Sequence, residues 1–440
     1  MKKLFFCVSI LILSVMSVAP TKVTHGVAAY VYAFAERMPG DSINISAIDP
    51  ITLETAVIFH SVPDANLTTI AVILSPDGEK VALWSRRFEN ANTVLKVIDI
   101  RSGKVLAKTE FVEGNQGESV MTFPDRMRWS PNSAFIAFNA SQAINTPSDV
   151  HILSLATDID TNVTHSDQVH DFQFSWPPNS AQLLVVSGTC SEQCDLALDL
   201  YSVPSFEKLA SVPMKFLPYA FPEEALCSPV WSPDAVKVAF TVECHYAGIF
   251  PFREIYVFDI SRQQFQQVTS FSHLPLNDHD STFYVAKYSF VWMNTATLAV
   301  GASIDKVIPA TEVGDQVAET VLFHLGNPQA FPLLDYRVEQ WARNPATEQV
   351  AFRLLTRDDF DPLGEVFIGS FVGETLAIER ALPDGGDFQW SPDGAILAYR
   401  DKQQSAYSIT FVDMQTGIVH PFTIITSHNA FALGWTHTNQ

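Results

Sequence analysis

The sequence predicts an all-β fold built from a repeated unit, and three observations carry this prediction. One phrase recurs along the chain: a Trp or Leu, a short polar turn that usually contains Pro, and then an apolar strand. The segments between the copies are rich in β-branched and aromatic residues that alternate with polar ones, as strands do. None of these segments has helical periodicity. The copies are anchored at residues 74, 129, 176, 231, 292, 341, 390 and 435.

Each unit is predicted to contain four antiparallel strands. In the copy at Trp390, we expect strand a at Phe388–Trp390, b at Ala395–Arg400, c at Tyr407–Asp413 and d at Ile418–Thr423. One such unit cannot bury its own apolar face, so successive units must stack on one another. A stacked array of four-stranded antiparallel units is a β-propeller, with each unit forming one blade.

The two ends of the repeat predict how the array closes. Trp435 has no strands after it, whereas residues 27–60 contain three expected strands with no anchor before them. These strands begin at Val27, Ser42 and Thr52. We therefore expect the C-terminal strand to complete the N-terminal blade, which would remove exposed strand edges. This gives eight blades, or seven if the irregular unit at Trp292 or Trp341 is not a true blade.

The N-terminus has the pattern of an export signal. Met1-Lys2-Lys3 precedes an apolar run that ends near Ala19. A basic start, an apolar run and small residues at its end are typical of a secretory signal, here residues 1–26, with cleavage after Ala19 or Gly26. An uncleaved anchor helix is the alternative, although the run is short for a full span. The propeller would then occupy residues 27–440 of a secreted or periplasmic protein, with no membrane span in the mature chain.

The net charge and the absence of common catalytic and nucleotide-binding motifs argue against several classes of function. The formal net charge is −21, so nucleic acid is not expected as a partner, because phosphate binding requires clustered Lys and Arg. The sequence contains no GxSxG, P-loop, HExxH or dinucleotide-binding motif. We expect no cofactor, and we expect the chain to be a monomer.

Four cysteines follow the predicted signal, and export would permit disulfides between them. Cys227 and Cys244 flank the turn after Trp231 and are expected to face each other across a hairpin. Cys190 and Cys194 would then close a small loop. Cross-pairings and four buried free thiols are the alternatives that the sequence leaves open.

Blade topology predicts a single binding face. The a–b and c–d turns of all blades share one end of the sheets, and the b–c and d–a connections share the other end. The long segments are all b–c or d–a connections: Val112–Pro124, Pro213–Cys227, Cys244–Glu254, Ser272–Ser289, Ser303–Glu319 and Thr356–Glu365. Long connections that collect on one face of a repeat array are typical of a binding surface. We name this end the long-loop face.

Aromatic and acidic residues in these segments are the candidate site residues. Aromatic side chains anchor protein interfaces, which suggests the following contact residues: Tyr219, Phe221, Tyr246, Phe250, Phe252, Phe283 and Tyr284. Capping of the core is the alternative role for them. The acidic residues that could bind calcium or another metal are Asp278, Asp280, Asp358, Asp359 and Asp361.

The WSPDG-type turn followed by an apolar strand resembles the TolB-type, WD-like propeller repeats of exported bacterial proteins. The resemblance is carried by the copies at Leu74, Trp129, Trp231 and Trp390, and it extends over nearly the whole mature chain. Similar blades form the propeller domain of prolyl-oligopeptidase-like enzymes. The resemblance implies a propeller fold, while family members include docking proteins and enzyme caps.

Together these features predict an exported, non-enzymatic propeller that binds a protein through its long-loop face. A polysaccharide-binding propeller is one alternative. A metal-assisted hydrolase or lyase with its site at the channel mouth is the other.

Overall fold

The computed structural model describes residues 30–38, 42–61, 67–87, 92–112, 127–141, 146–165, 169–190, 194–215, 227–241, 254–269, 283–307, 317–327, 330–334, 337–355, 364–401, 407–424 and 430–437. Within these ranges the regular structure is β-strand throughout, as the sequence predicts. The described residues include no helix of the length and apolarity needed to cross a membrane.

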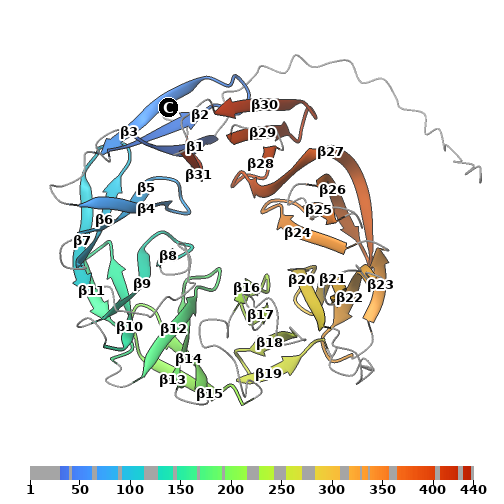
Figure 1. The fold of residues 1–440 in the computed structure, drawn as a ribbon, viewed down its shortest axis with the longest axis horizontal. Helices are drawn as coiled ribbons and strands as arrows, with labels where there is room; N and C mark the ends of the chain where they lie inside the picture. The colour runs from blue at the N-terminus through green and yellow to red at the C-terminus, as the bar shows by residue number, and fades with distance from the viewer. Residues whose placement is uncertain are drawn as a thin grey trace, which may run out of the picture.

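Figure 1 shows the sheets arranged around a common centre, following one another in chain order from blue to red. The first sheet has the order β3-β2-β1-β31. It consists of β1 (Tyr30–Arg37), β2 (Ile43–Ile48), β3 (Thr55–Ser61) and β31 (Ala430–His437).

The second sheet contains eight strands that correspond to two successive sequence units. Its first half is β4 (Thr68–Leu74), β5 (Lys80–Arg86), β6 (Asn92–Asp99) and β7 (Val105–Val112). Its second half is β8 (Met127–Trp129), β9 (Phe135–Ser141), β10 (Ser148–Ser154) and β11 (Ile159–Asn162). One register pair, Val112 with Ser141, joins β7 to β9.

Three four-stranded antiparallel sheets follow, each in chain order. The first is β12 (His170–Ser175), β13 (Gln182–Cys190), β14 (Cys194–Ser202) and β15 (Lys208–Pro213). The second is β16 (Cys227–Trp231), β17 (Lys237–Thr241), β18 (Ile255–Asp259) and β19 (Gln264–Gln267). The third is β20 (Phe283–Trp292), β21 (Thr297–Val307), β22 (Val317–His324) and β23 (Ala330–Leu334).

The last sheet has seven strands, because one long strand serves two units. Its strands are β24 (Arg337–Arg343), β25 (Gln349–Leu355), β26 (Gly364–Val372), β27 (Thr375–Trp390), β28 (Ile396–Asp401), β29 (Tyr407–Asp413) and β30 (Val419–Ile424). β27 pairs with β26 through its first part and with β28 through its last part. It therefore occupies the d position of one unit and the a position of the next without an intervening loop.

The strands at the two ends of the described chain pair with each other. β31 runs antiparallel to β1 and places Trp435 opposite Tyr32. The Trp435 ring makes edge contacts with Tyr32, at a centroid distance of 5.3 Å, and with Phe411 of β29, at 6.1 Å. The terminal strand thus belongs to the first sheet and also packs against the last one.

The core consists of apolar clusters that lie between neighbouring sheets. One cluster joins Ile152 of β10 and Trp176 to Val185 of β13. Another joins Leu198 of β14 to Phe240 of β17. Alternation along each strand supplies both faces of a sheet with buried side chains, and each sheet therefore depends on its two neighbours.

The recurring Trp has a repeated contact, which corrects one predicted anchor. The indole Nε1 donates to a backbone carbonyl in the inner strand of the preceding unit for Trp129 (3.4 Å), Trp176 (3.3 Å), Trp292 (2.8 Å), Trp390 (2.9 Å) and Trp435 (3.3 Å). Trp341 does not follow this rule, and its buried Nε1 has no hydrogen-bond partner.

The anchor position of that unit is held by Arg343. The Asn344 N–H donates to the Gln349 carbonyl at 2.8 Å, just as the Ser391 N–H donates to the Ile396 carbonyl at 2.8 Å after Trp390. Arg343 Nη1 donates to the Trp292 carbonyl at 3.0 Å, so a guanidinium makes the link to the preceding unit that an indole makes elsewhere. Trp341 instead packs on Phe371, with ring centroids 6.1 Å apart.

Candidate functional site

Strand directions separate the molecule into two ends. The a–b and c–d turns are short and largely described, and each joins adjacent antiparallel strands. The long predicted segments leave from the opposite ends of the strands, for example after Val112 of β7, Pro213 of β15 and Thr241 of β17. Their attachment points therefore share the long-loop face, while most of the segments themselves lie outside the described residues.

Most predicted site residues also lie outside the described ranges. This applies to the contact candidates Tyr219, Phe221, Tyr246, Phe250 and Phe252, and to the acidic candidates Asp278, Asp280, Asp358, Asp359 and Asp361. Phe283 and Tyr284 are the described candidates, and both belong to β20 rather than to a loop.

The sequence predicted a connection over Ser272–Ser289, but β20 already begins at Phe283. β20 pairs with β21 without interruption from Phe283 opposite Val307 to Trp292 opposite Leu298. The sequence FYVAKYSFVW is dense in aromatic and β-branched residues, which suit a paired strand. Phe283 and Tyr284 thus begin a strand at the long-loop face.

Three of the four cysteines lie in described strands, and their register tests part of the predicted pairing. Cys190 lies opposite Cys194 at the end of the β13–β14 hairpin. Cys227 lies opposite Thr241 and not opposite Cys244 as expected. The tight turn sets this register by placing Trp231 opposite Val238, and an irregularity between Cys227 and Val230 shifts the pairing by one further residue. Cys244 falls outside the described residues, so both disulfides stay predictions.

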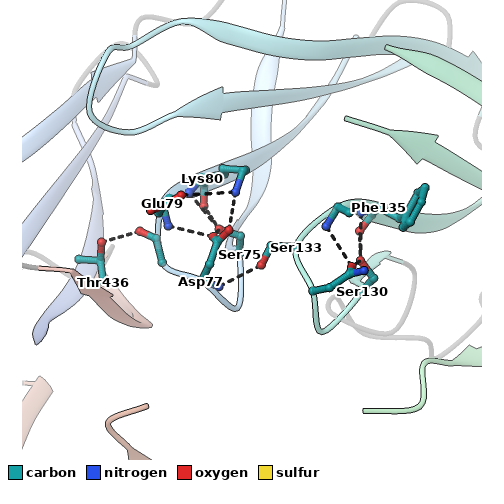
Figure 2. A network of polar contacts seen from close by, with 11 residues as sticks. Ser75, Asp77, Glu79, Lys80, Ser130, Ser133, Phe135 and Thr436 are labelled. Atoms are coloured by element: carbon teal, nitrogen blue, oxygen red, sulfur yellow. Dashed lines mark hydrogen bonds and ion pairs between the residues drawn. The ribbon is translucent and has the colours of Figure 1, made fainter. Parts of the chain in front are cut away.

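At the opposite end, hydrogen bonds link three successive a–b turns, and Figure 2 shows the first two of these turns. Within one turn, Ser75 Oγ donates to Asp77 Oδ1 at 2.5 Å and accepts the Lys80 N–H at 2.9 Å. The Asp77 N–H donates to Ser133 Oγ in the next turn at 3.0 Å. In the same way, the Asn132 N–H donates to Ser180 Oγ at 3.0 Å, so one turn is linked to the following one.

The terminal strand joins the same chain of turns. Thr436 Oγ1 donates to the Gly78 carbonyl at 2.5 Å (Figure 2). Burial raises the pKa of the Asp77 carboxyl, but hydrogen bonds from Lys80, Ser75 and the Glu79 N–H outweigh that effect and leave the pKa below its usual value. The polar residues of these turns bind one another, which gives them a structural role.

A small pocket lies at this turn end, at the seam between the last and first sheets. Its volume is about 110 Å³, and its lining includes Tyr30, Ile51, Asp393 and Asp413. Both carboxylates are already used by their own turns. Asp393 Oδ1 accepts the Ser391 hydroxyl at 2.6 Å, and Asp413 Oδ1 accepts the Gln415 N–H at 2.8 Å. The pocket is therefore a packing gap lined by turn residues.

A buried polar group beneath the long-loop face is the most unusual site of the described residues. Asp171 lies near the start of β12 and is 0% exposed. Its carbonyl accepts hydrogen bonds from Asn139 Nδ2 at 2.9 Å and Ser148 Oγ at 3.0 Å. Its carboxylate Oδ2 faces the Val150 N–H at 3.3 Å, and its Oδ1 has no hydrogen-bond partner.

Two further acids are buried nearby, and together with Asp171 they form what we name the acid cluster. Asp149 of β10 is 3% exposed and Asp199 of β14 is 2% exposed. Burial raises the pKa of Asp171 to about 7. A hydrogen bond from Thr164 opposes this rise, and the charges of Asp149 and Asp199 add to it. The main physical cause is the lost hydration of the buried Asp171 carboxylate, and the neighbouring negative charges make its ionisation still less favourable.

Asp149 has a structural counterpart in another sheet. Thr164 Oγ1 accepts the Val150 N–H at 3.0 Å and lies 3.5 Å from Asp149 Oδ1. In a later sheet, Thr269 Oγ1 accepts the Ile255 N–H at 2.9 Å and donates to Glu254 Oε2 at 2.5 Å. An acid–threonine pair therefore fixes the start of strand c in both sheets.

Sequence reasoning missed the acid cluster. The available signal was an aspartate five residues before Trp176, inside an expected inner strand where apolar residues are the rule. Within the described part of the chain, no three or more His, Cys, Asp or Glu side chains are grouped so that they could hold a metal ion.

No family model matches the sequence, and no curated protein matches it. Several solved structures are similar in fold. Dihydro-heme d1 dehydrogenase NirN has a TM-score of 0.49 and 11% identity, over 94% of this chain and 77% of that chain. The C-terminal WD40 domain of Sif2 has a TM-score of 0.44 and 8% identity, over 84% and 89%.

The propeller domain of the Trilobed protease from Pyrococcus furiosus has a TM-score of 0.39 and 13% identity, over 83% of this chain and 95% of that chain. Identities of this size do not indicate a shared activity. The arrangement of stacked antiparallel sheets around a common centre makes this chain an all-β protein with the architecture of a β-propeller.

Proposed function

We propose that the chain is an exported, eight-bladed propeller of the TolB-like type that binds a protein partner through its long-loop face. It acts by rigid presentation of that face and not by catalysis. The export step is proposed from the pattern of residues 1–26 alone.

The strand orders support eight blades. Both irregular sequence units form runs of four antiparallel strands, β20–β23 and β24–β27. The strands β27–β30 form one further run, and β31 with β1–β3 forms another. The pairing of Trp435 with Tyr32 supports closure of the ring through the first blade.

The observation that carries the docking role is the difference between the two ends of the sheets. Turns at one end are tied to one another by hydrogen bonds, for example from the Asp77 N–H to Ser133 Oγ at 3.0 Å. All the long connections attach at the other end. The sheets that carry these connections are already rigid, so they lose little conformational freedom when the surface binds a partner. This small entropic cost favours recognition.

The proposal is tested by comparing how tightly the partner binds to variants altered at the long-loop face and to variants altered at the turn end. The full secreted protein would be immobilised and exposed to the secreted fraction of its own source, and the retained protein would be identified and its affinity measured. A Tyr219→Ala, Phe221→Ala double variant removes two candidate anchors of the long-loop face. We expect affinity for the identified partner to fall by about tenfold or more, because an aromatic hot-spot residue contributes over ~1 kcal/mol.

Matched apolar substitutions at the turn end provide the control. Ile159 and Ile418 are 56% and 52% exposed and lie next to c–d turns. An Ile159→Ala, Ile418→Ala double variant should retain full affinity. Equal loss in both double variants would contradict a face-specific role. One equivalent of bound metal, lost on replacement of Asp358, Asp359 and Asp361, would favour the hydrolase or lyase instead.

A further inference from the structure

The acid cluster lies in a joint between two sheets. Asp171 belongs to the inner strand β12, and the groups that hold its backbone carbonyl, Asn139 and Ser148, belong to β9 and β10 of the preceding sheet. The apolar side chains of this joint include Val150, Phe174 and Val185, all almost completely buried. Any change in the charge of Asp171 therefore acts on the contact between two neighbouring sheets.

The hydrogen bonding around Asp171 is incomplete for an ionised carboxylate. A fully buried carboxylate needs two or three donors to offset its lost hydration, but Asp171 Oδ1 has none. Asn139 Oδ1 and Asp199 Oδ1 are also buried acceptors that have no donor. A proton on Asp171 would remove its charge and convert an acceptor without a partner into a donor, in a region where donors are missing.

No basic side chain among the described residues is ion-paired with Asp171 to take the place of this proton. Lys208 of β15 is bound to Asp199 Oδ2 at 2.7 Å. His151 of β10 is bound to Asp160 of β11 at 2.8 Å. The titratable and charged groups that face or flank Asp171 from β10, β12, β14 and β15 are Asp149, His151, His170, Asp199, Tyr201 and Lys208.

We propose that the joint between β10 and β12 is a proton-dependent latch, which is closed while Asp171 is neutral and weakened when Asp171 ionises. The latch lies at the long-loop end of the sheets, because Asp171 lies near the start of β12 and Asp149 near the start of β10. Ionisation would therefore loosen the support of the long-loop face rather than the turn end.

The direction of the pH effect follows from proton linkage. Opening of the joint exposes Asp171 to water and returns its pKa to the ordinary value near ~3.9. The closed state holds the proton up to a pKa of about 7. Between these two values the open state binds fewer protons, so the closed state loses stability as the pH rises from about 4 to about 7. The loss is complete above that range.

Hydrogen exchange measured by mass spectrometry on the full chain tests the latch. Peptides covering β10 and β12 would be compared at pH 5 and pH 8, with correction for the intrinsic exchange rate. We expect their protection to fall by a factor on the order of 10- to 100-fold at pH 8. Peptides covering β28 and β29, on another part of the ring, provide the internal reference and should keep their protection.

Substitutions assign the effect to one carboxyl group. Asp171→Asn is a neutral side chain of the same shape, and its protection in β10 and β12 should be high and equal at both pH values. Asp259→Asn removes a partly buried turn carboxylate in another sheet and should keep the wild-type profile. His170→Gln should also keep it, which separates the effect of Asp171 from that of the histidine next to it in the sequence.

Three results would overturn the latch. The first is a wild-type profile in which β10 and β12 respond to pH no more than β28 and β29, a result that needs no variant to fold. The second is a profile that becomes flat in His170→Gln. The third is full recovery of protection at pH 8 on addition of 1 mM CaCl₂, because a bound cation rather than a proton would then neutralise the acid cluster.

Discussion

At the residue scale, the anchor of each unit is defined by backbone hydrogen bonds and not by the identity of its side chain. The sequence drew attention to Trp341 because Trp is rare and recurs at similar spacing elsewhere. The structure places Arg343 at the anchor, where its guanidinium reaches the carbonyls of Trp292 and Met293 at 3.0 and 3.1 Å. A sequence pattern cannot distinguish two such positions, because both Trp and Arg supply an N–H donor on a large planar group.

Gly78 provides a residue-scale test of how the terminal strand packs on the first a–b turn. Its φ is +71°, and a Cβ at this position would lie 2.5 Å from both the Thr436 Cα and the Trp435 carbonyl oxygen. Both are backbone atoms, so they cannot move away without displacing β31. We expect Gly78→Ala to lower the free energy of unfolding by about 3 kcal/mol or more, from overlap and from the strain of a left-handed Ala.

Gly103 separates these two causes. Its φ is +66°, but a Cβ there would have no atom within 4 Å. Gly103→Ala should therefore lower the free energy of unfolding only by the conformational strain, about 1 kcal/mol. Urea titration of both variants measures the two losses. Equal losses for Gly78→Ala and Gly103→Ala would show that β31 does not press on the first turn.

At the element scale, strands with a clear alternation were predictable and their junctions were not. Tyr407–Asp413 was predicted as strand c and is β29 with the same bounds. β27 was not predicted as one strand, because Pro383, Gly385 and Gly386 indicate a break in the sequence. The structure instead runs through them from an outer to an inner position, a choice that depends on pairing with both β26 and β28.

The candidate site was less predictable than the fold for a related reason. Asp171 was visible in the sequence only as an acid in an apolar strand, and its partners Asn139 and Ser148 come from a different unit. Contacts between units depend on how sheets stack, and no local pattern encodes that stacking. The long segments that carry Tyr219 and Tyr246 have no repeat at all, so the sequence could propose their role but not their geometry.

The β13–β14 hairpin leads to an element-scale prediction about the cysteines. Cys190 and Cys194 are register partners next to the connection between the two strands, and register partners can have Cβ atoms close to the separation that a disulfide needs. We expect the exported protein to show no alkylation of its four cysteines before reduction and four alkylated cysteines afterwards, measured by mass spectrometry. Four alkylated thiols in the unreduced protein would reject both disulfides.

At the scale of the whole molecule, stability depends on the meeting of two chain ends that are about four hundred residues apart in sequence. The first sheet would have an unpaired inner edge at β1 without β31, because the two strands pair from Tyr30 opposite His437 to Glu36 opposite Ala430. Trp435 and Tyr32 also belong to an apolar cluster with Phe411 of the last sheet. The chain ends therefore join the first and last sheets at one point of the ring.

Trp435→Ala tests this joint and should lower the free energy of unfolding by about 3–5 kcal/mol, the usual cost of truncating a buried Trp. Hydrogen exchange should rise first in β1 and β31, because the lost ring packs on Tyr32. Trp129→Ala is a matched control, since both indoles are 7% exposed and donate to carbonyls at similar distances, 3.4 and 3.3 Å. It should cost a similar free energy while β1 keeps its protection. If Trp129→Ala exposes β1 as much as Trp435→Ala does, the ring unfolds as one unit and the terminal joint has no separate role in holding it closed.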